Sequence, residues 1–263
     1  EGGYLVRRLS GGGAVFHDLG NLNFTFIVRK PDYDVDRQLQ VILEAVRRLG
    51  IQAEKTGRND ITVEGRKFSG NAFYQTGDCC YHHGTLLVHA DKENMSRYLN
   101  VPREKLASKG VSSVKSRVAN LDEFCPGLTV DRVKAALAEA FSQVYGQVAE
   151  KMEEKELPED AIGPLTEKFE SWQWKYGRKI PFEHEMEQRF AWGGIQMQFH
   201  VDGGRIQEVN VFSDAMDQEL IGNLSERLKG CPYDGNAMCE AVKEAGTEGG
   251  IRQDILSLIK ESM

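Results

Sequence analysis

The sequence predicts a mixed α+β protein with a larger N-terminal domain and a small C-terminal α+β domain. Residues 22–28 (LNFTFIV) and 195–201 (IQMQFHV) alternate between apolar and other side chains, as β-strands do. Other stretches repeat their apolar residues at helical spacing. The 263 residues are enough for one large domain with a smaller one attached. We expect the domains to span residues 1–178 and 179–263.

The first predicted elements flank a glycine-rich loop. Residues 4–8 and 22–28 are expected to form strands on either side of a glycine triplet at 11–13. Asp34 is expected to cap a helix that stops at Gly50. The apolar stripe of this helix comprises Leu39, Ile42, Leu43, Val46 and Leu49.

The middle of the chain predicts short strands and a long helix. Residues 61–63 and 67–68 are expected to form strands joined by a tight turn at Glu64 and Gly65, and residues 85–90 to form another. A short helical piece is expected near 103–109. A longer helix is expected to begin at Thr129. Its inner stripe comprises Val133, Ala136, Leu137, Ala140, Phe141 and Val144.

The C-terminal part follows a charged stretch at 147–160, which we expect to be a solvated helix or strand end. The segment YGRKIPF at 176–182 indicates a connection between domains. Beyond it, two strands form a hairpin around Gly203 and Gly204. Helices are expected at 217–228, 235–245 and 250–260.

Charge and cysteine content exclude several classes of protein. The chain has 33 basic and 40 acidic residues, a formal charge of −7, which argues against general binding to nucleic acid or to an anionic membrane. It has no apolar run of transmembrane length and no signal-like segment. The five cysteines form no disulfide framework and indicate reduced thiols in the cytoplasm. Because the chain opens in a predicted strand without Met, we expect an N-terminal portion to be missing, so a mitochondrial location stays open.

The glycine triplet is the first candidate binding feature. Glycine permits unusual turns and lets a ligand approach the backbone closely. Because Arg7 and Arg8 precede the triplet, the expected ligand is a phosphate group. The alternative is a loose turn between strands. The stretch matches neither the Walker loop nor the GxGxxG fingerprint.

Lys67, in the segment GRKFSGNAF, is the second candidate. Its ammonium can contact phosphate or carboxylate oxygens, and small residues beside it would let the backbone approach a ligand. The alternative is an ordinary surface lysine. His17 can line the same pocket as the triplet or be a loop histidine with a structural hydrogen bond.

We predict no metal site. Cys79, Cys80, His82 and His83 lie close together, but adjacent residues on an extended chain point to opposite faces. The serines and basic residues of GVSSVKSRVANL at 110–121 suit a loop that closes over phosphate, or else a flexible basic loop. No Ser/His/Asp or Cys/His catalytic set is recognisable.

Several motifs occur in the order found in one enzyme family. These are RRLSGGGAVFHDLGNLNFTF, GRNDI, GRKFSGNAF, YHHGTLL and GVSSVKSRVANL. With the FAWGG segment of the small domain, the chain resembles the lipoate protein ligases from about residue 3 to its C-terminus. The resemblance implies a mixed sheet flanked by helices, similar to biotin protein ligases and the catalytic cores of class II aminoacyl-tRNA synthetases, plus an accessory domain.

The resemblance also implies a reaction in two steps. Lipoate and the Mg²⁺ complex of ATP would give lipoyl-AMP and pyrophosphate, and the lipoyl group would then pass to a lysine of an acceptor. Implied acceptors are the apo lipoyl domains of 2-oxoacid dehydrogenase complexes and the glycine cleavage H protein. When a carboxylate attacks the α-phosphorus, the negative charges of the carboxylate and of the phosphate must both be offset. The basic residues present suit this role.

Site residues follow from the same resemblance. Lys67 matches the catalytic lysine that contacts both lipoate and the adenylate, and Arg8 matches the nucleotide-binding arginine. Residues 110–120 match the loop that folds over the adenylate, and Asn59 and Asp60 suggest metal or phosphate help without an assigned Mg²⁺ ligand. The remaining matches are Gly13, Ala14, Val15 and Phe16 for backbone contacts to ATP, and Ser10, His17 and His83 for the lipoyl pocket.

Two other functions stay open at this point. An octanoyl or lipoyl transferase of the same fold would use an activated acyl donor and often a cysteine, for which Cys125 is the residue to test. A non-catalytic module would bind an acceptor domain without activating lipoate. The resemblance further implies several dozen residues ahead of this point, which help wall the lipoate pocket in family members, and we expect this portion to be missing from the sequence given.

Overall fold

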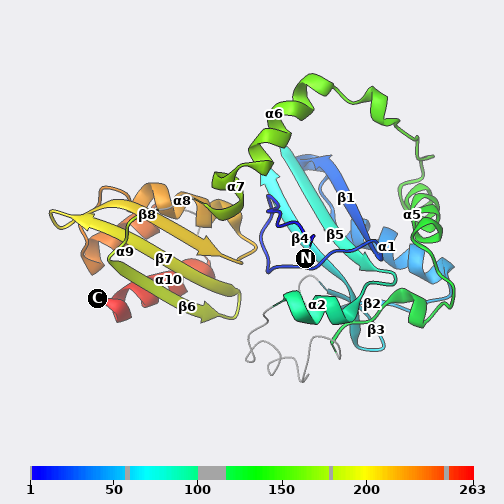
Figure 1. Ribbon diagram of the computed structural model, residues 1–263, viewed down its shortest axis with the longest axis horizontal. Coiled ribbons are helices and arrows are strands. Elements are labelled where there is room, and N and C mark those ends of the chain that lie inside the picture. Colours follow the sequence, from blue (N-terminus) through cyan, green and yellow to red (C-terminus); the bar gives the residue numbers. More distant parts are fainter. Residues whose placement is uncertain (1, 57–59, 100–116, 178–179, 246–248) are drawn as a thin grey trace. The chain divides into compact units, whose positions relative to one another are not determined.

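The computed structural model describes residues 2–56, 60–99, 117–177, 180–245 and 249–263. The chain divides into two compact units, Ala14–Met152 and Glu1–Gly13 together with Glu153–Met263. We call them the five-stranded unit and the three-stranded unit after their sheets (Figure 1). The predicted domain boundary at 178/179 stays a prediction, because both residues lie outside the described part of the chain.

The five-stranded unit is built on an antiparallel sheet with strand order β1-β5-β4-β3-β2. Its strands are β1 (Asn21–Arg29), β2 (Glu54–Thr56), β3 (Asp60–Val63), β4 (Arg66–Thr76) and β5 (Cys79–Leu87). Its helices are η1 (Lys30–Asp32), α1 (Val35–Arg48), α2 (Lys92–Tyr98), η2 (Leu121–Glu123) and α5 (Val130–Tyr145).

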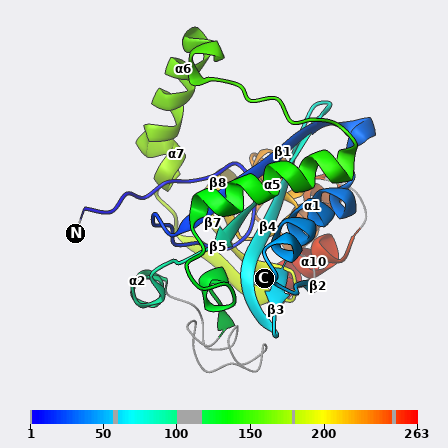
Figure 2. The ribbon, with the colours of Figure 1, turned by 90° about the vertical axis from the view of Figure 1, so that its right-hand side faces the viewer.

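The two long helices begin at the caps that their sequences predict, and α1 also ends as predicted. The Asp34 side chain accepts a hydrogen bond from Arg37 N at the start of α1, and Gly50 follows its end with φ +81°. Thr129 caps α5 through Arg132 N, and Gly146 ends it in the left-handed conformation. Figure 2 shows α1 and α5 side by side against the sheet. The stripe residues buried in the core are Leu39, Ile42, Val46, Val133, Ala136 and Ala140.

The hairpin between β3 and β4 is confirmed. Glu64 and Gly65 both have positive φ, at +50° and +73°, as a two-residue turn matching the twist of the strands requires. Strands β4 and β5 are much longer than expected, because they pair with each other from Ser69–Leu86 to Thr76–Cys79. Cross-strand pairing of mixed polar and apolar residues carries these strands beyond their apolar runs.

The two faces of this sheet differ in character. His82, Asn71 and Phe24 lie on the face covered by α1, where His82 is fully buried and contacts Gln38 of that helix. Direct cross-strand partners share a face, so Ala72, His83 and Thr25 lie on the opposite one. This opposite face is the one that carries the candidate site described below.

The three-stranded unit contains an antiparallel sheet with strand order β6-β7-β8 and three helices that bury its apolar face. Met197 and Phe199 of β7 pack with Leu224 and Ile259 in one core. The predicted hairpin around Gly203 and Gly204 and the three predicted helices are confirmed. The elements are η3 (Glu154–Glu156), α6 (Glu159–Glu170), α7 (Trp172–Tyr176), β6 (His184–Phe190), β7 (Gly193–Asp202), β8 (Arg205–Ser213), α8 (Gln218–Leu228), α9 (Gly235–Lys243) and α10 (Gly250–Ser262).

The strand expected at residues 4–8 is wrong. Residues 2–8 form no regular secondary structure, because no described strand pairs with them. Arg7 is instead held by α7: Trp174 Nε1 donates to Arg7 O over 2.8 Å, and Arg7 Nε donates to Lys175 O over 3.1 Å. The helix expected near 103–109 lies outside the described residues. Among the helices described, none is long and apolar enough to cross a membrane.

Candidate active site

Lys67 lies where β4 departs from regular pairing with β3. Thr62 pairs with Lys67 and Ile61 with Ser69, so Phe68 is an extra residue on β4. Such a β-bulge twists the strand locally and re-aims a side chain. On its other edge, Lys67 forms a parallel bridge to Val118, and Ala119 N donates to Lys67 O over 2.9 Å. The backbone of Lys67 is therefore held from both sides.

The Lys67 ammonium meets a carboxylate and a second cation. Lys67 Nζ lies 2.6 Å from Asp60 Oδ1, and Arg117 Nη2 lies 3.4 Å from Asp60 Oδ2. All three side chains are partly buried, with exposed fractions of 26% for Lys67, 21% for Arg117 and 16% for Asp60. Two cations share one carboxylate, so the cluster carries a net positive charge and suits an anionic ligand.

Gly70 makes room for the lysine side chain. A Cβ added at this position would lie 2.8 Å from Lys67 Nζ and 2.9 Å from its Cε. The small residues after Lys67 were expected to let the backbone approach a ligand. The observed contact of Gly70 is with the lysine itself, which lies across the sheet face that carries Ala72 and His83.

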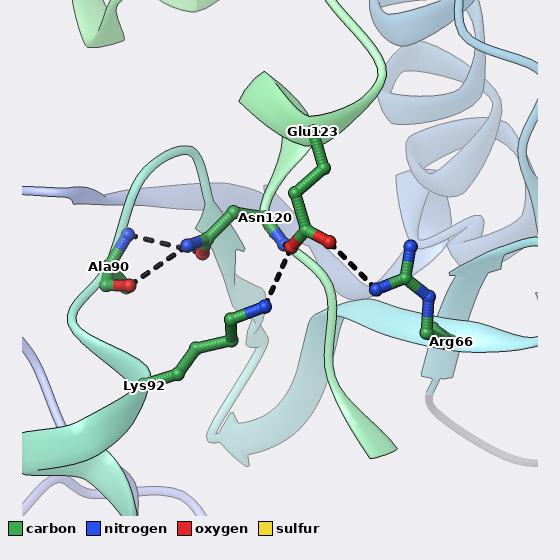
Figure 3. Close-up of polar contacts among 5 residues, drawn as sticks. All are labelled: Arg66, Ala90, Lys92, Asn120 and Glu123. Atoms are coloured by element: carbon green, nitrogen blue, oxygen red, sulfur yellow. Dashed lines mark hydrogen bonds and ion pairs between the residues drawn. The ribbon is translucent and has the colours of Figure 1, made fainter. Parts of the chain in front are cut away.

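A polar network fixes the segment that follows Arg117. The Asn120 side chain donates through Nδ2 to Ala90 O over 2.9 Å and accepts from Ala90 N over 3.1 Å, as Figure 3 shows. Glu123 accepts from Asn120 N over 2.7 Å and pairs with Arg66 at 2.7 Å and Lys92 at 2.9 Å. These contacts join β4, the start of α2 and η2 next to Lys67.

The charge state of Glu123 follows from these partners. Partial burial acts to raise the pKa of its carboxyl, but the hydrogen bonds from Asn120 N, Lys92 and Arg66 outweigh it. The pKa falls to about 2, so Glu123 is ionised throughout the physiological range. The Arg66 guanidinium also lies over the Phe124 ring, with its Cζ 5.2 Å from the ring centroid. Glu123 therefore keeps its negative charge, and with it the ion pairs that hold this segment, at neutral pH.

The histidines of YHHGTLL point to opposite faces of β5. His82 is buried, and both of its ring nitrogens have hydrogen-bond partners. Nδ1 lies 3.0 Å from Gln38 Oε1, and Nε2 lies 2.9 Å from Asn71 Oδ1. Burial, and secondarily the charge of His83, lowers its pKa to about 4, so it is neutral at pH 7. His83 lies on the face of Lys67 and contacts the Tyr81 ring. Within the described residues, no three His, Cys, Asp or Glu side chains are grouped to hold a metal ion.

Phe16 is linked to Lys67 through one small apolar cluster. Its ring stacks on Tyr98 with the centroids 5.9 Å apart, and it packs against Leu87, Ala90, Met95 and Val118. Val118 is the residue that bridges to Lys67. Ala14 and Val15, just before Phe16, are exposed. The end of the glycine-rich motif is thus packed beside the Lys67 strand.

His17 is exposed, and its neighbour Asp18 fixes the loop. Asp18 accepts from Gly20 N over 2.8 Å and from Asp91 N over 2.7 Å. A Cβ at Gly20 would lie 2.4 Å from His89 O, so only glycine fits there. The HDLG part of the motif therefore has a structural reason of its own.

Arg8, Ser10 and Gly13 belong to the three-stranded unit and are described within it. The Arg8 guanidinium lies inside the glycine turn and donates from Nη2 to Gly11 O over 2.7 Å and to Gly13 O over 2.9 Å. Gly12 has φ +94° and donates to Asp214 O over 3.2 Å. The triplet is a tight turn around an arginine, and Ser10 is buried beside it.

Other expected site residues fall outside this arrangement. Asn59 and most of the loop at 110–120 lie outside the described residues; only the last residues of the loop, from Arg117, are described. Cys125 is partly buried and packs against the core of the five-stranded unit. Sequence reasoning missed the anchoring residues Glu123 and Asn120, although Asn120 followed three residues later by Glu123 is a recognisable capping pattern.

Two family models match the chain. The lipoyl protein ligase A/B catalytic domain matches residues 1–142, and the bacterial lipoate protein ligase C-terminus matches residues 179–259.

Solved structures of lipoate ligases are similar to this chain. LipL1 of P. falciparum, solved in complex with lipoate, is 28% identical with a TM-score of 0.81, over 98% of this chain and 76% of that one. The bipartite lipoate protein ligase of Thermoplasma acidophilum, studied with its E2 lipoyl domain, is 33% identical with a TM-score of 0.57. The match covers 67% of this chain and 72% of that one. A lipoate-protein ligase A bound with ATP is 29% identical with a TM-score of 0.55, and the match covers 66% of this chain and 72% of that one. The mixed α+β fold is confirmed, and the chain belongs to the lipoyl protein ligase A/B catalytic domain family.

Proposed function

We propose that this protein is an ATP-dependent lipoate ligase that forms lipoyl-AMP and transfers the lipoyl group to a lysine of an acceptor lipoyl domain. The observation that carries the proposal is the Lys67 cluster in a chain of this family. Lys67 and Arg117 are held together by one carboxylate. Two cations converging on one place suit a reaction between two anions, the lipoate carboxylate and the α-phosphate of ATP.

In the first step, a lipoate carboxylate oxygen attacks the α-phosphorus and pyrophosphate leaves. Lys67 would offset charge on both the carboxylate and the phosphate, and Arg8 and the backbone of Gly13, Ala14, Val15 and Phe16 would hold the nucleotide. Mg²⁺ enters as the substrate complex with ATP. Relatives of this chain have been solved with lipoate and with ATP, which supports both ligands for this protein.

In the second step, the amine of an acceptor lysine attacks the lipoyl carbonyl and AMP leaves. Ser10, His17 and His83 are proposed to lie near the lipoyl group. The position of His83 on the same sheet face as Lys67 supports that role. The T. acidophilum relative was studied with an E2 lipoyl domain, which supports apo lipoyl domains as acceptors here.

The test measures pyrophosphate release by the purified protein with ATP and Mg²⁺, with and without lipoate. We expect release that depends on lipoate and that is lost in Lys67→Ala. Adding an apo lipoyl domain should then give a product heavier by one lipoyl group. Transfer from preformed lipoyl-AMP without any lipoate-dependent pyrophosphate release would instead identify a transferase, and no tight binding of lipoyl-AMP would identify a docking module.

A transferase using Cys125 as nucleophile has less support. The thiol packs against apolar core residues, and a catalytic cysteine needs an accessible, electropositive surrounding. Cys125→Ala is expected to keep transfer from lipoyl-AMP, and its loss in that variant would favour the transferase mechanism.

A further inference from the structure

We propose that Asp60 is a positioning residue for this reaction: its carboxylate holds Lys67 and Arg117 together so that both cations face the same anionic ligand. This inference rests on the proposed function. Asp60 is the first residue of β3, and Lys67 and Arg117 come from β4 and from the segment leading to η2. The two cations are fifty residues apart in sequence and meet at one carboxylate group.

The backbone brings the three residues together before any ligand binds. The β3–β4 hairpin sets Asp60 opposite Gly70, three residues beyond Lys67, and the bulge between them turns Lys67 out of its regular position. The parallel bridge between Lys67 and Val118 places Arg117 one residue from the same point. Because Gly70 has no side chain, the Lys67 stem can cross it to reach Asp60.

A lysine side chain needs such an anchor more than most. Its four-carbon stem has several rotatable bonds and loses rotamer entropy when one position is imposed. The ion pair at 2.6 Å selects one position in advance, so a ligand does not have to order the lysine when it binds. Preorganisation of the charged group is then a property of the free protein.

The charges argue that Asp60 acts through the cations rather than on the ligand. A carboxylate repels the anionic groups of both substrates, so its direct effect on their binding is unfavourable. Without it, however, Lys67 and Arg117 would be two partly buried cations that repel each other and separate. With Asp60 in place the cluster keeps one net positive charge and a fixed geometry.

The test is a double-mutant cycle of Asp60→Asn and Lys67→Ala. Its readout is the affinity for the acyl-sulfamate analogue of lipoyl-AMP, measured by calorimetry, because binding can be measured even when turnover is lost. We expect Asp60→Asn to weaken binding by about tenfold when Lys67 is present and by no more than about twofold in the Lys67→Ala background. An equal loss in both backgrounds would overturn the inference, because Asp60 would then act independently of Lys67.

Two further variants sharpen the cycle. Asp60→Glu keeps the charge and is expected to recover part of the lost affinity, whereas no recovery relative to Asp60→Asn counts against an ionic role. Asp122→Asn, a nearby carboxylate in η2 outside the cluster, is the matched control and should bind like the wild type. If the wild type itself neither binds the analogue nor releases pyrophosphate with lipoate, the proposed function fails, which is distinct from a cycle that shows no coupling.

Discussion

At the scale of single residues, Gly70 has a role that no other residue type can take. Its missing side chain is the space that the end of the Lys67 side chain occupies. Because the atoms that a Cβ would meet belong to the flexible end of a lysine, Gly70→Ala should displace Lys67 and leave the fold intact. We expect lipoate-dependent pyrophosphate release to fall by about 10²-fold, as misplacement of a catalytic group by about 1 Å can do.

The matched control for this variant is Gly222→Ala. Gly222 lies inside α8 and a Cβ there would meet nothing within 4 Å, so activity should be unchanged. Unfolding in urea, followed by circular dichroism, should give Gly70→Ala a midpoint close to the wild type. Wild-type activity in Gly70→Ala would mean that the position of the lysine does not matter.

His82 predicts a second residue-scale effect, on stability. Burial lowers its folded-state pKa to about 4, below the value near 6.5 expected for the unfolded chain. Stability from neutral His82 is therefore complete above pH 6.5 and is lost as the pH falls towards 4, by about 3 kcal/mol. Urea unfolding at several pH values should show this decline, and His82→Gln, which cannot titrate, should lack it.

Some of the candidate site residues are recognisable in the sequence and others are not. Lys67 and the glycine triplet stand in long motifs, so their neighbours identify them. The partners Asp60 and Arg117 meet Lys67 only through a bulge and a bridge between distant segments, which no local pattern encodes. The same reason hides the Arg8 contacts: the carbonyls that accept from its guanidinium depend on the path of the glycine turn.

At the scale of elements, sequence periodicity was sufficient where an element buries one face. Helices α1 and α5 and strand β7 have clear apolar stripes and were predicted with their caps or turns. The missed elements bury little: α6 and α7 contain no buried residue, α2 buries only Met95, and β6 buries only Met186. Elements that depend on pairing or local bonding leave no periodic signal.

The junction of β4, α2 and η2 predicts an element-scale effect. Glu123 joins these elements, so Glu123→Gln should keep the bond from Asn120 N but lose its ion pairs with Arg66 and Lys92. We expect a loss of about 1–2 kcal/mol in unfolding free energy at pH 7. The folded-state pKa is lowered to about 2, so this stability is present above pH 4.5 and lost as the pH falls towards 2.

The pH dependence separates this anchor from general surface charge. The difference in urea midpoint between wild type and Glu123→Gln should shrink as the pH falls from 4.5 towards 2, because the carboxyl takes up a proton more readily in the unfolded chain than in the folded protein. Asp122→Asn should show no such difference at either pH. A difference that stays constant over this range would show that the ion pairs of Glu123 contribute nothing.

At the scale of the whole molecule, the two units have separate cores. The clusters around Ile42 lie within Ala14–Met152 and the cluster around Leu224 within Glu153–Met263, and no cluster of described residues contains members of both. All three tryptophans, Trp172, Trp174 and Trp192, belong to the three-stranded unit, so their fluorescence reports on that unit alone. Leu224→Ala leaves a cavity in the core of the three-stranded unit and should lower the unfolding free energy of that unit by about 2–5 kcal/mol. The midpoint of the fluorescence transition should then fall to a lower urea concentration. Ile42→Ala should leave that midpoint unchanged and lower only the part of the circular dichroism transition due to the five-stranded unit. Equal shifts of both signals in both variants would show instead that the chain unfolds as one cooperative unit.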